Sequence, residues 1–171
     1  MARRTNLRDF QEGLASRLKA AAGASASEAR LAFEAGGSLW LVRLEDSGEV
    51  LAVPAIERVP LTRDWFLGVA NVRGVIYGVT DLSAFLGGAP TPRGPDNRLL
   101  LAGQPHGVNA ALLVSRLAGL RNVGELEAAE IASLGAQWAE RAWSDSEGRV
   151  WQELDGAKLV AHREFLDIAL P

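Results

Sequence analysis

Residues 64–88 read DWFLGVANVRGVIYGVTDLSAFLGG, and this stretch carries the clearest structural signals in the chain. In residues 67–72 successive side chains would point to opposite faces, and one face would carry only the small residues Gly68, Ala70 and Val72. This alternation predicts a β-strand. Arg73 and Gly74 then turn the chain, because glycine supplies the backbone angles that a tight bend needs. Residues 75–80 are nearly all apolar and predict a second strand that is covered on both faces. Together these signals predict a tight β-hairpin.

A short helix is predicted directly after the second strand. Asp81 stands where the N-cap of a helix belongs, since its carboxylate can accept hydrogen bonds from the first free backbone N–H groups. Leu82, Phe85 and Leu86 follow at helical spacing, and the glycine pair 87–88 predicts the end of the helix.

Arg73 is a cation at the tip of an otherwise apolar hairpin. A guanidinium that is held between two stiff strands is well placed to meet a carboxylate on another molecule. Two other interpretations stay open from the residues alone. In the first, Arg73 is an ordinary solvated turn residue. In the second, it forms an ion pair with Asp64 or Asp81 within the same fold.

The residues from Trp65 to Gly87 follow the order W-x-x-G-V-A-N-V-R-G-x-x-x-x-V-x-D-L-x-x-F-L-G. This order resembles the signature of CheW-like domains, most closely that of the PilI-type adaptors of type IV pilus chemosensory systems. The chain departs from the family pattern at two positions. Gly78 stands where the family usually has proline, and Ser115 stands where it usually has aspartate, so no role of that acid is carried over.

The resemblance implies an all-β fold of two SH3-like five-stranded β-barrel subdomains, with an N-terminal and a C-terminal helix. Residues 30–171 would form the CheW-like domain, and residues 1–29 would form an amphipathic helix, over 5–22, and a connector. The segment 87–97 holds three prolines and three glycines, so it cannot form a regular element, and we expect it to link the two subdomains.

The second half of the chain is expected to supply the second barrel. Its strands are predicted over residues 98–102, 108–114 and 117–123. A hairpin turn is predicted at 145–148, and residues 156–170 resemble the closing helix of the family.

The resemblance also implies a function, that of an adaptor with no chemistry of its own. Such an adaptor would couple the signalling tip of a methyl-accepting chemoreceptor to the regulatory domain of a CheA-type histidine kinase. The closest subtype implies control of type IV pili and twitching motility from a cytoplasmic location at receptor arrays. Arg73 is the first candidate for partner binding, with Asn71 and Gly74 shaping its turn. Glu49, at the family's acidic position, is the second.

Composition excludes several other functions. The 171 residues include no cysteine and two histidines, so thiolate chemistry is excluded and no histidine-rich metal site is expected. A net charge of −3 does not favour nucleic-acid binding, and no apolar run is long enough to span a membrane. We therefore expect no enzyme, no cofactor and no metal. Two alternatives stay open: a regulatory or ligand-binding β-barrel that shares the fold, and, less favoured, an unrecognised enzyme.

Overall fold

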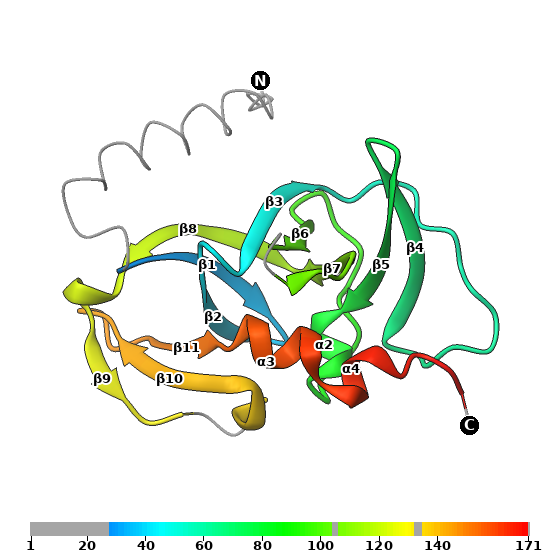
Figure 1. The fold of residues 1–171 in the computed structure, drawn as a ribbon. Helices are drawn as coiled ribbons and strands as arrows, with labels where there is room; N and C mark the ends of the chain where they lie inside the picture. The colour runs from blue at the N-terminus through cyan, green and yellow to red at the C-terminus, as the bar shows by residue number, and fades with distance from the viewer. Residues whose placement is uncertain (1–27, 104–105, 132–134, 171) are drawn as a thin grey trace.

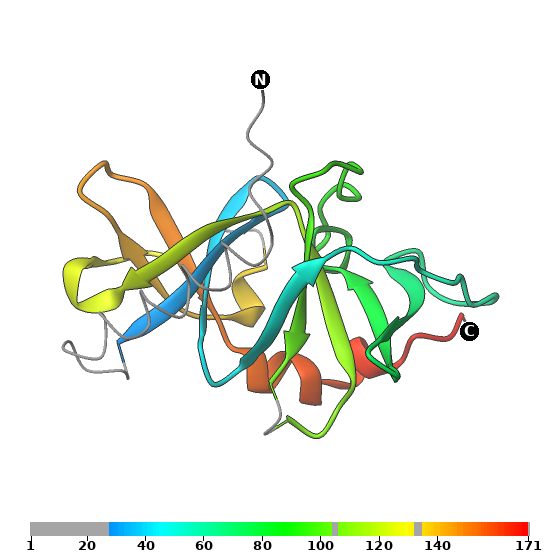
Figure 2. The ribbon, with the colours of Figure 1, turned by 90° about the horizontal axis from the view of Figure 1, so that it is seen from above.

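A computed structural model describes residues 28–103, 106–131 and 135–170 of the chain. These residues form two β-sheets that lie side by side, with three short helices along one side of both (Figures 1 and 2). The helix predicted over residues 5–22 lies outside the described residues.

One sheet has six strands in the order β8-β1-β2-β11-β10-β9. Its members are β8 (Arg116–Asn122), β1 (Ala29–Ala35), β2 (Ser38–Arg43), β11 (Val150–Leu154), β10 (Ala139–Ser144) and β9 (Glu127–Ala129). Neighbouring strands run antiparallel except β2 and β11, which are parallel. The turn predicted at 145–148 is confirmed, because it joins β10 to β11, and the backbone N–H of Gly148 donates to the carbonyl of Asp145.

The other sheet has five strands in the order β3-β6-β7-β5-β4. Its members are β3 (Ser47–Ala52), β6 (Arg98–Ala102), β7 (Ala110–Val114), β5 (Val75–Asp81) and β4 (Phe66–Val72). Only β5 and β7 run parallel. The strands β3 and β4 are therefore the two edges of this sheet.

The observed sheets differ from the expected pair of barrels in two respects. They are open sheets rather than closed five-stranded barrels. They also do not divide the chain into halves, because β6 and β7 join the strands that precede them, whereas β8 returns to pair with β1. The irregular segment 87–97 connects two strands of the five-stranded sheet, β5 through α2 (Leu82–Phe85) to β6, rather than one sheet to the other.

The closing helix predicted over 156–170 is two short helices, α3 (Gly156–Ala161) and α4 (Arg163–Leu166). The break falls at His162, which has extended backbone angles and caps α4 by accepting a hydrogen bond at Nδ1 from the N–H of Glu164. A side chain that offers the backbone an acceptor at this position favours a helix start over continuation. Two 3₁₀ turns, η2 (Val123–Glu125) and η3 (Ala136–Trp138), complete the regular elements of the described residues.

The main hydrophobic core lies between the two sheets and under the helices. It includes Phe33, Trp40, Leu82, Trp138, Leu154 and Leu159, all nearly inaccessible to solvent. Smaller clusters cover the opposite face of each sheet, around Val79, Leu99 and Leu113 in the five-stranded sheet and around Leu41 and Trp151 in the six-stranded sheet. Alternate residues of the same strand thus point into different cores, which requires apolar residues on both faces of β6 and β7.

Candidate partner-binding site

The hairpin of β4 and β5 ends in a two-residue turn formed by Arg73 and Gly74. Their φ angles are 52° and 86°, so both lie in the left-handed region that a type I′ turn requires. Val72 and Val75 pair directly before and after the turn. The backbone N–H of Gly74 donates to Oδ1 of Asn71 at 2.8 Å. Asn71 and Gly74 thus shape the turn, and together they hold Arg73 at its tip.

Arg73 forms a bidentate ion pair with Glu49, another of the residues that the sequence singled out. Its two terminal nitrogens donate to the two carboxylate oxygens, each at 2.7 Å. The Arg73 side chain remains 74% exposed and that of Glu49 29% exposed. The interpretation in which Arg73 pairs with Asp64 or Asp81 is therefore wrong. Its partner comes from β3, at the opposite edge of the same sheet.

The chain after β3 also reaches β4, through one isolated bridge between Glu57 and Val69. Glu57 and Val69 exchange backbone hydrogen bonds of 2.8 and 2.9 Å. Gly68 has a φ of 130°, and a Cβ built on it would lie 2.1 Å from the carbonyl oxygen of Glu57. Only glycine permits this close approach of two backbones. The alternation in 67–72 is thus confirmed, with the small residues facing inward.

The hairpin tip is more exposed than the sequence predicts. The prediction that the second strand is covered on both faces is wrong for its first residues, because Val75 is 42% and Ile76 52% exposed. The pairing of β5 with β7 starts only at Gly78, so the first part of β5 extends beyond its neighbour. Two exposed apolar side chains therefore follow Arg73 at the tip, and no sequence pattern indicated their exposure.

Asp81, in contrast, is a buried structural residue, 2% exposed. Its carboxylate accepts a hydrogen bond from the N–H of Ala84 at 3.3 Å, so the predicted N-cap is confirmed. It also accepts from the N–H of Thr91 at 2.7 Å and from the Thr91 hydroxyl at 2.8 Å. Asp81 thereby fixes the segment 87–97 against the start of α2, and the sequence did not indicate the part that Thr91 plays.

Trp65 belongs to an aromatic cluster at the foot of the hairpin. Its ring stacks on Phe165 of α4 at 6.4 Å between centroids and meets Phe85 of α2 edge to face at 5.0 Å. Such contacts between rings fix the orientation of the helices against β4.

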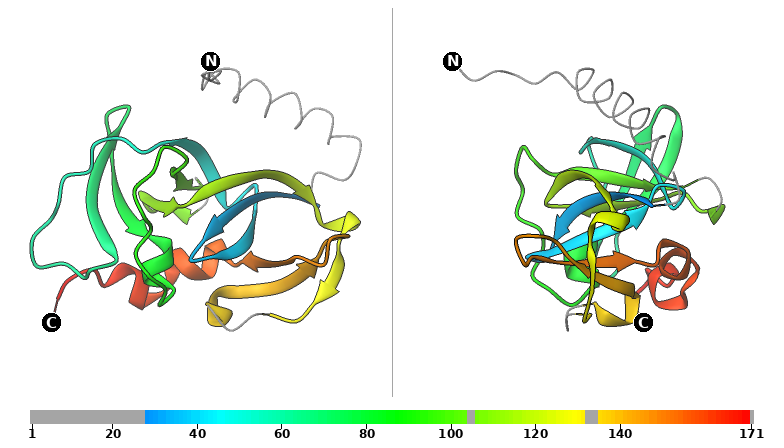
Figure 3. Two further views of the ribbon diagram at one scale, coloured as in Figure 1. Left: turned by 180° about the vertical axis from the view of Figure 1, so that it is seen from behind. Right: turned by 90° about the vertical axis from the view of Figure 1, so that its left-hand side faces the viewer.

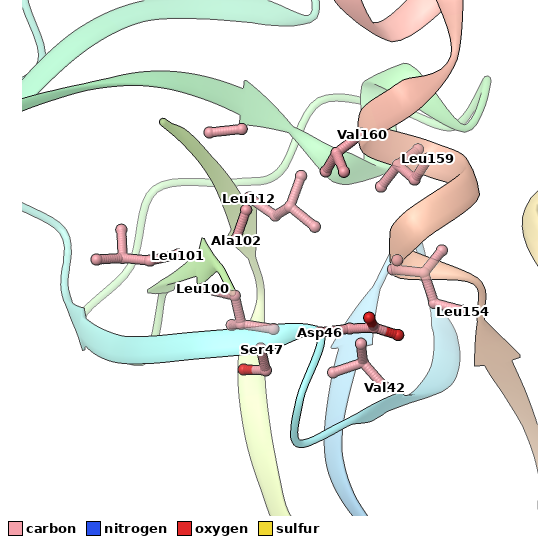
Figure 4. Close-up of a pocket in the computed structure, with 12 residues that line it drawn as sticks. Val42, Asp46, Ser47, Leu100, Leu101, Ala102, Leu112, Leu154, Leu159 and Val160 are labelled. Atoms are coloured by element: carbon pink, nitrogen blue, oxygen red, sulfur yellow. The ribbon is translucent and has the colours of Figure 1, made fainter. Parts of the chain in front are cut away.

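A small apolar hollow lies between the two sheets beside α3 (Figure 4). Its walls include Val42, Leu100, Leu112, Leu154 and Leu159, and Asp46 stands at one end. Burial raises the pKa of the Asp46 carboxyl, against the opposing effect of His106, whose Nε2 lies 3.0 Å from Asp46 Oδ1.

Neither the hairpin tip nor this hollow assembles catalytic groups. Among the residues that the structure describes, no three histidine, aspartate or glutamate side chains gather where they could hold a metal ion. The same residues include no helix that is long and apolar enough to cross a membrane.

Residues 30–164 match the model of the CheW-like domain. The chain belongs to the CheW-like domain family. Protein PilI of Pseudomonas aeruginosa is 33% identical over 109 residues, which cover 64% of this chain and 61% of that protein. The match thus spans less than two thirds of PilI. The crystal structure of the scaffolding protein TtCheW from Thermoanaerobacter tengcongensis shares the fold, with a TM-score of 0.65 and 19% identity over 75% of this chain and 84% of that one.

These matches confirm the resemblance to CheW-like domains and to their PilI-type members. The family is therefore that of CheW-like domains, and the fold is shared with TtCheW, which is described as a scaffolding protein. The roles of Arg73, Asn71, Gly74 and Glu49 in partner binding stay predictions.

Proposed function

We propose that this CheW-like protein couples a chemoreceptor to a CheA-type histidine kinase at membrane-associated receptor arrays in the cytoplasm. The relationship to PilI supports control of type IV pili as the output. The observation that carries the proposal is the hairpin tip, where an exposed guanidinium is followed directly along the chain by two exposed apolar residues, Val75 and Ile76. Interfaces of this composition, an arginine with apolar neighbours, are typical of protein recognition sites.

The hairpin tip would bind the regulatory domain of the kinase. Glu49 engages one donor on each terminal nitrogen of Arg73, so the guanidinium, with five N–H donors, keeps others for a partner. The ion pair and the Asn71 hydrogen bond fix the tip before binding, which lowers the entropic cost of association. Val75 and Ile76 would supply the apolar contact.

The junction between the two sheets would receive the helical signalling tip of the receptor. The hollow in Figure 4 marks this junction, but its lining residues Leu154 and Leu159 are buried, so a receptor helix would lie across the junction rather than enter the hollow. Receptor and kinase would then occupy separate surfaces of one scaffold. Signalling needs no chemistry in the adaptor, because its geometry alone sets the distance between the two partners.

A calorimetric titration with the regulatory domain of a CheA-type kinase from the same genome tests the proposal. We expect saturable one-to-one binding that Arg73→Glu weakens by about tenfold or more, because the substitution places two carboxylates at the tip. Arg163→Glu is the matched control: Arg163 is exposed on α4 and makes no ion pair within the described residues, so the same charge change should leave binding intact. Absence of heat at about 100 μM, far above the dissociation constant of a standard interface, would contradict the proposal.

A further inference from the structure

The turn of residues 44–46 carries the chain from one sheet to the other, because it joins β2 to β3. The backbone carbonyl of Asp46 accepts a hydrogen bond of 2.9 Å from the N–H of Gly103, the residue that follows β6. The N–H of His106 donates in turn to the carbonyl of Gly103 at 3.1 Å. Figures 1 and 3 show α3 beside the place where the two sheets meet. The turn therefore links the end of β2, in the six-stranded sheet, to residues that follow β6 in the five-stranded sheet.

Two glycines show how tightly this turn is held. A Cβ built on Gly103 would lie 2.3 Å from the carbonyl oxygen of Glu45, so the two backbones touch there. A Cβ built on Gly156, the first residue of α3, would lie 2.8 Å from the Cβ of Asp46. Only glycine permits approaches of this kind. Because packed segments transmit strain, a movement of Asp46 would be passed both to Gly103 and to the start of α3.

The side chain of Asp46 meets the imidazole of His106 in a buried contact. His106 Nε2 lies 3.0 Å from Asp46 Oδ1, and the two side chains are 9% and 10% exposed. Within the described part of the chain, however, Nε2 makes no hydrogen bond of good alignment. The attraction between the two groups is therefore chiefly one of charge, and it is strong only while the imidazole carries a second proton. A neutral ring would leave a polar nitrogen buried without a partner, which costs free energy.

The other charged groups around Asp46 act on its carboxylate in opposite directions. Burial raises the pKa of the Asp46 carboxyl, and the largest contribution that opposes this effect is the charge of His106. Arg43 at the end of β2 also favours the ionised carboxylate, whereas Glu45 in the same turn and Asp155 at the N-cap of α3 disfavour it. The charge of His106 is thus the main compensation for burying this carboxylate, and the contact responds to the protonation of the ring.

We propose that the contact between Asp46 and His106 is a proton-dependent latch between the two sheets. While both groups are charged, the latch holds Gly103 and His106 against the turn 44–46. As the pH rises and the imidazole loses its proton, the attraction weakens, and this part of the five-stranded sheet moves more freely against the end of β2. Histidines in proteins change charge between about pH 5 and 8, so such a latch works in the physiological range. It concerns this chain alone and does not rest on kinase or receptor binding.

Hydrogen–deuterium exchange at single amides tests the latch, because the N–H of Gly103 is bonded to the carbonyl of Asp46. The protection factor, which is corrected for the intrinsic effect of pH on exchange, should fall by about fivefold or more at Gly103 between about pH 6 and 8. The N–H of Glu57, which is bonded to β4, is the internal control and should keep its protection. His106→Gln should abolish the fall at Gly103. His162→Gln makes the same change at the other of the chain's two histidines and should preserve the fall.

Titration of the two histidines by NMR tests the charge coupling itself. Asp46→Asn should move the titration midpoint of His106 to lower pH, because the neighbouring negative charge is gone, and should leave the midpoint of His162 unchanged. The same variant separates the latch from a purely structural contact: it should still melt cooperatively, and its protection factor at Gly103 should no longer vary between about pH 6 and 8. Constant protection at Gly103 in the native chain, a fall that persists in His106→Gln, or a His106 midpoint that Asp46→Asn does not move would each overturn the proposal.

Discussion

Arg73 and Glu49 join the two edges of the five-stranded sheet. Glu49 lies on β3 and Arg73 at the end of β4, strands that are separated by three others in the sheet. Backbone hydrogen bonds of Glu57 with Val69 make a second link, between the segment after β3 and β4. An exposed ion pair of this kind contributes only about 0.2–1 kcal/mol to folding. Its main effect is therefore to fix the orientation of the hairpin tip.

Charge reversal distinguishes two roles for this ion pair. Arg73→Glu and Glu49→Arg should each lower the free energy of unfolding by no more than about 1 kcal/mol, and the double variant should recover most of the loss. Urea denaturation of the four proteins measures this coupling. If the kinase contacts Arg73 directly, the double variant folds normally but does not recover binding. Recovery of full affinity would show that the pair acts only by holding the hairpin tip.

Gly68→Ala should be more destabilising than Gly74→Ala. Both glycines have positive φ, so each substitution introduces left-handed strain of about 1–2 kcal/mol. At Gly74 nothing lies within 4 Å of the added methyl, whereas at Gly68 it would overlap the carbonyl oxygen of Glu57. We expect Gly68→Ala to cost at least about 1 kcal/mol more in urea denaturation and to release Glu57 from β4. Equal costs for the two variants would contradict this account of the link between Glu57 and Val69.

The sequence predicted features that depend on neighbouring residues. The two-residue turn at Arg73 and Gly74, the N-cap at Asp81 and the alternation in 67–72 each follow from backbone preferences over a few positions. The all-β fold was predicted from the resemblance to CheW-like domains rather than from these local features.

Features that depend on distant residues could not be predicted. The resemblance singled out Glu49 as a candidate, but its ion pair with Arg73, 24 positions away, was not predicted, because nothing local indicates the partner of a surface glutamate. The exposure of Ile76 depends on where β7 begins, and the pairing of β8 with β1 depends on contacts across most of the chain. The left-handed backbone of Leu61 was not predicted, because leucine in a loop signals no backbone conformation.

Asp81→Ala should destabilise the protein far more than Asp64→Ala, although both aspartates flank the same hairpin. The change at Asp81 removes the N-cap of α2 and leaves the buried donors of Thr91 without an acceptor, at a cost of about 2–4 kcal/mol. Asp64 is exposed and forms no ion pair within the described part of the chain, so its loss should change stability by less than about 0.5 kcal/mol. Thermal melts of the two variants check the difference, and similar shifts would show that Asp81 is not the anchor inferred here.

Asp145 makes folding stability depend on pH at the β10–β11 turn. The indole N–H of Trp151 donates to its carboxylate at 3.0 Å, and the backbone N–H groups of Arg149 and Glu147 add two further hydrogen bonds. Chiefly through the Trp151 hydrogen bond, these donors hold the pKa of Asp145 well below its usual range. The unfolded chain therefore takes up a proton near pH 4 that the folded chain does not, so this contribution to stability is present above about pH 5 and is lost as the pH falls.

Asp145→Asn should consequently be less stable than the native chain at pH 7, and the difference should shrink steadily between pH 5 and pH 2. Urea midpoints of both proteins across this range measure the effect. Glu147→Gln is a suitable control, since the side chain of Glu147 is 67% exposed and its loss should alter the pH dependence little. A stability difference between Asp145→Asn and the native chain that stays constant from pH 7 to pH 2 would mean that the ionised carboxylate is not what stabilises this turn.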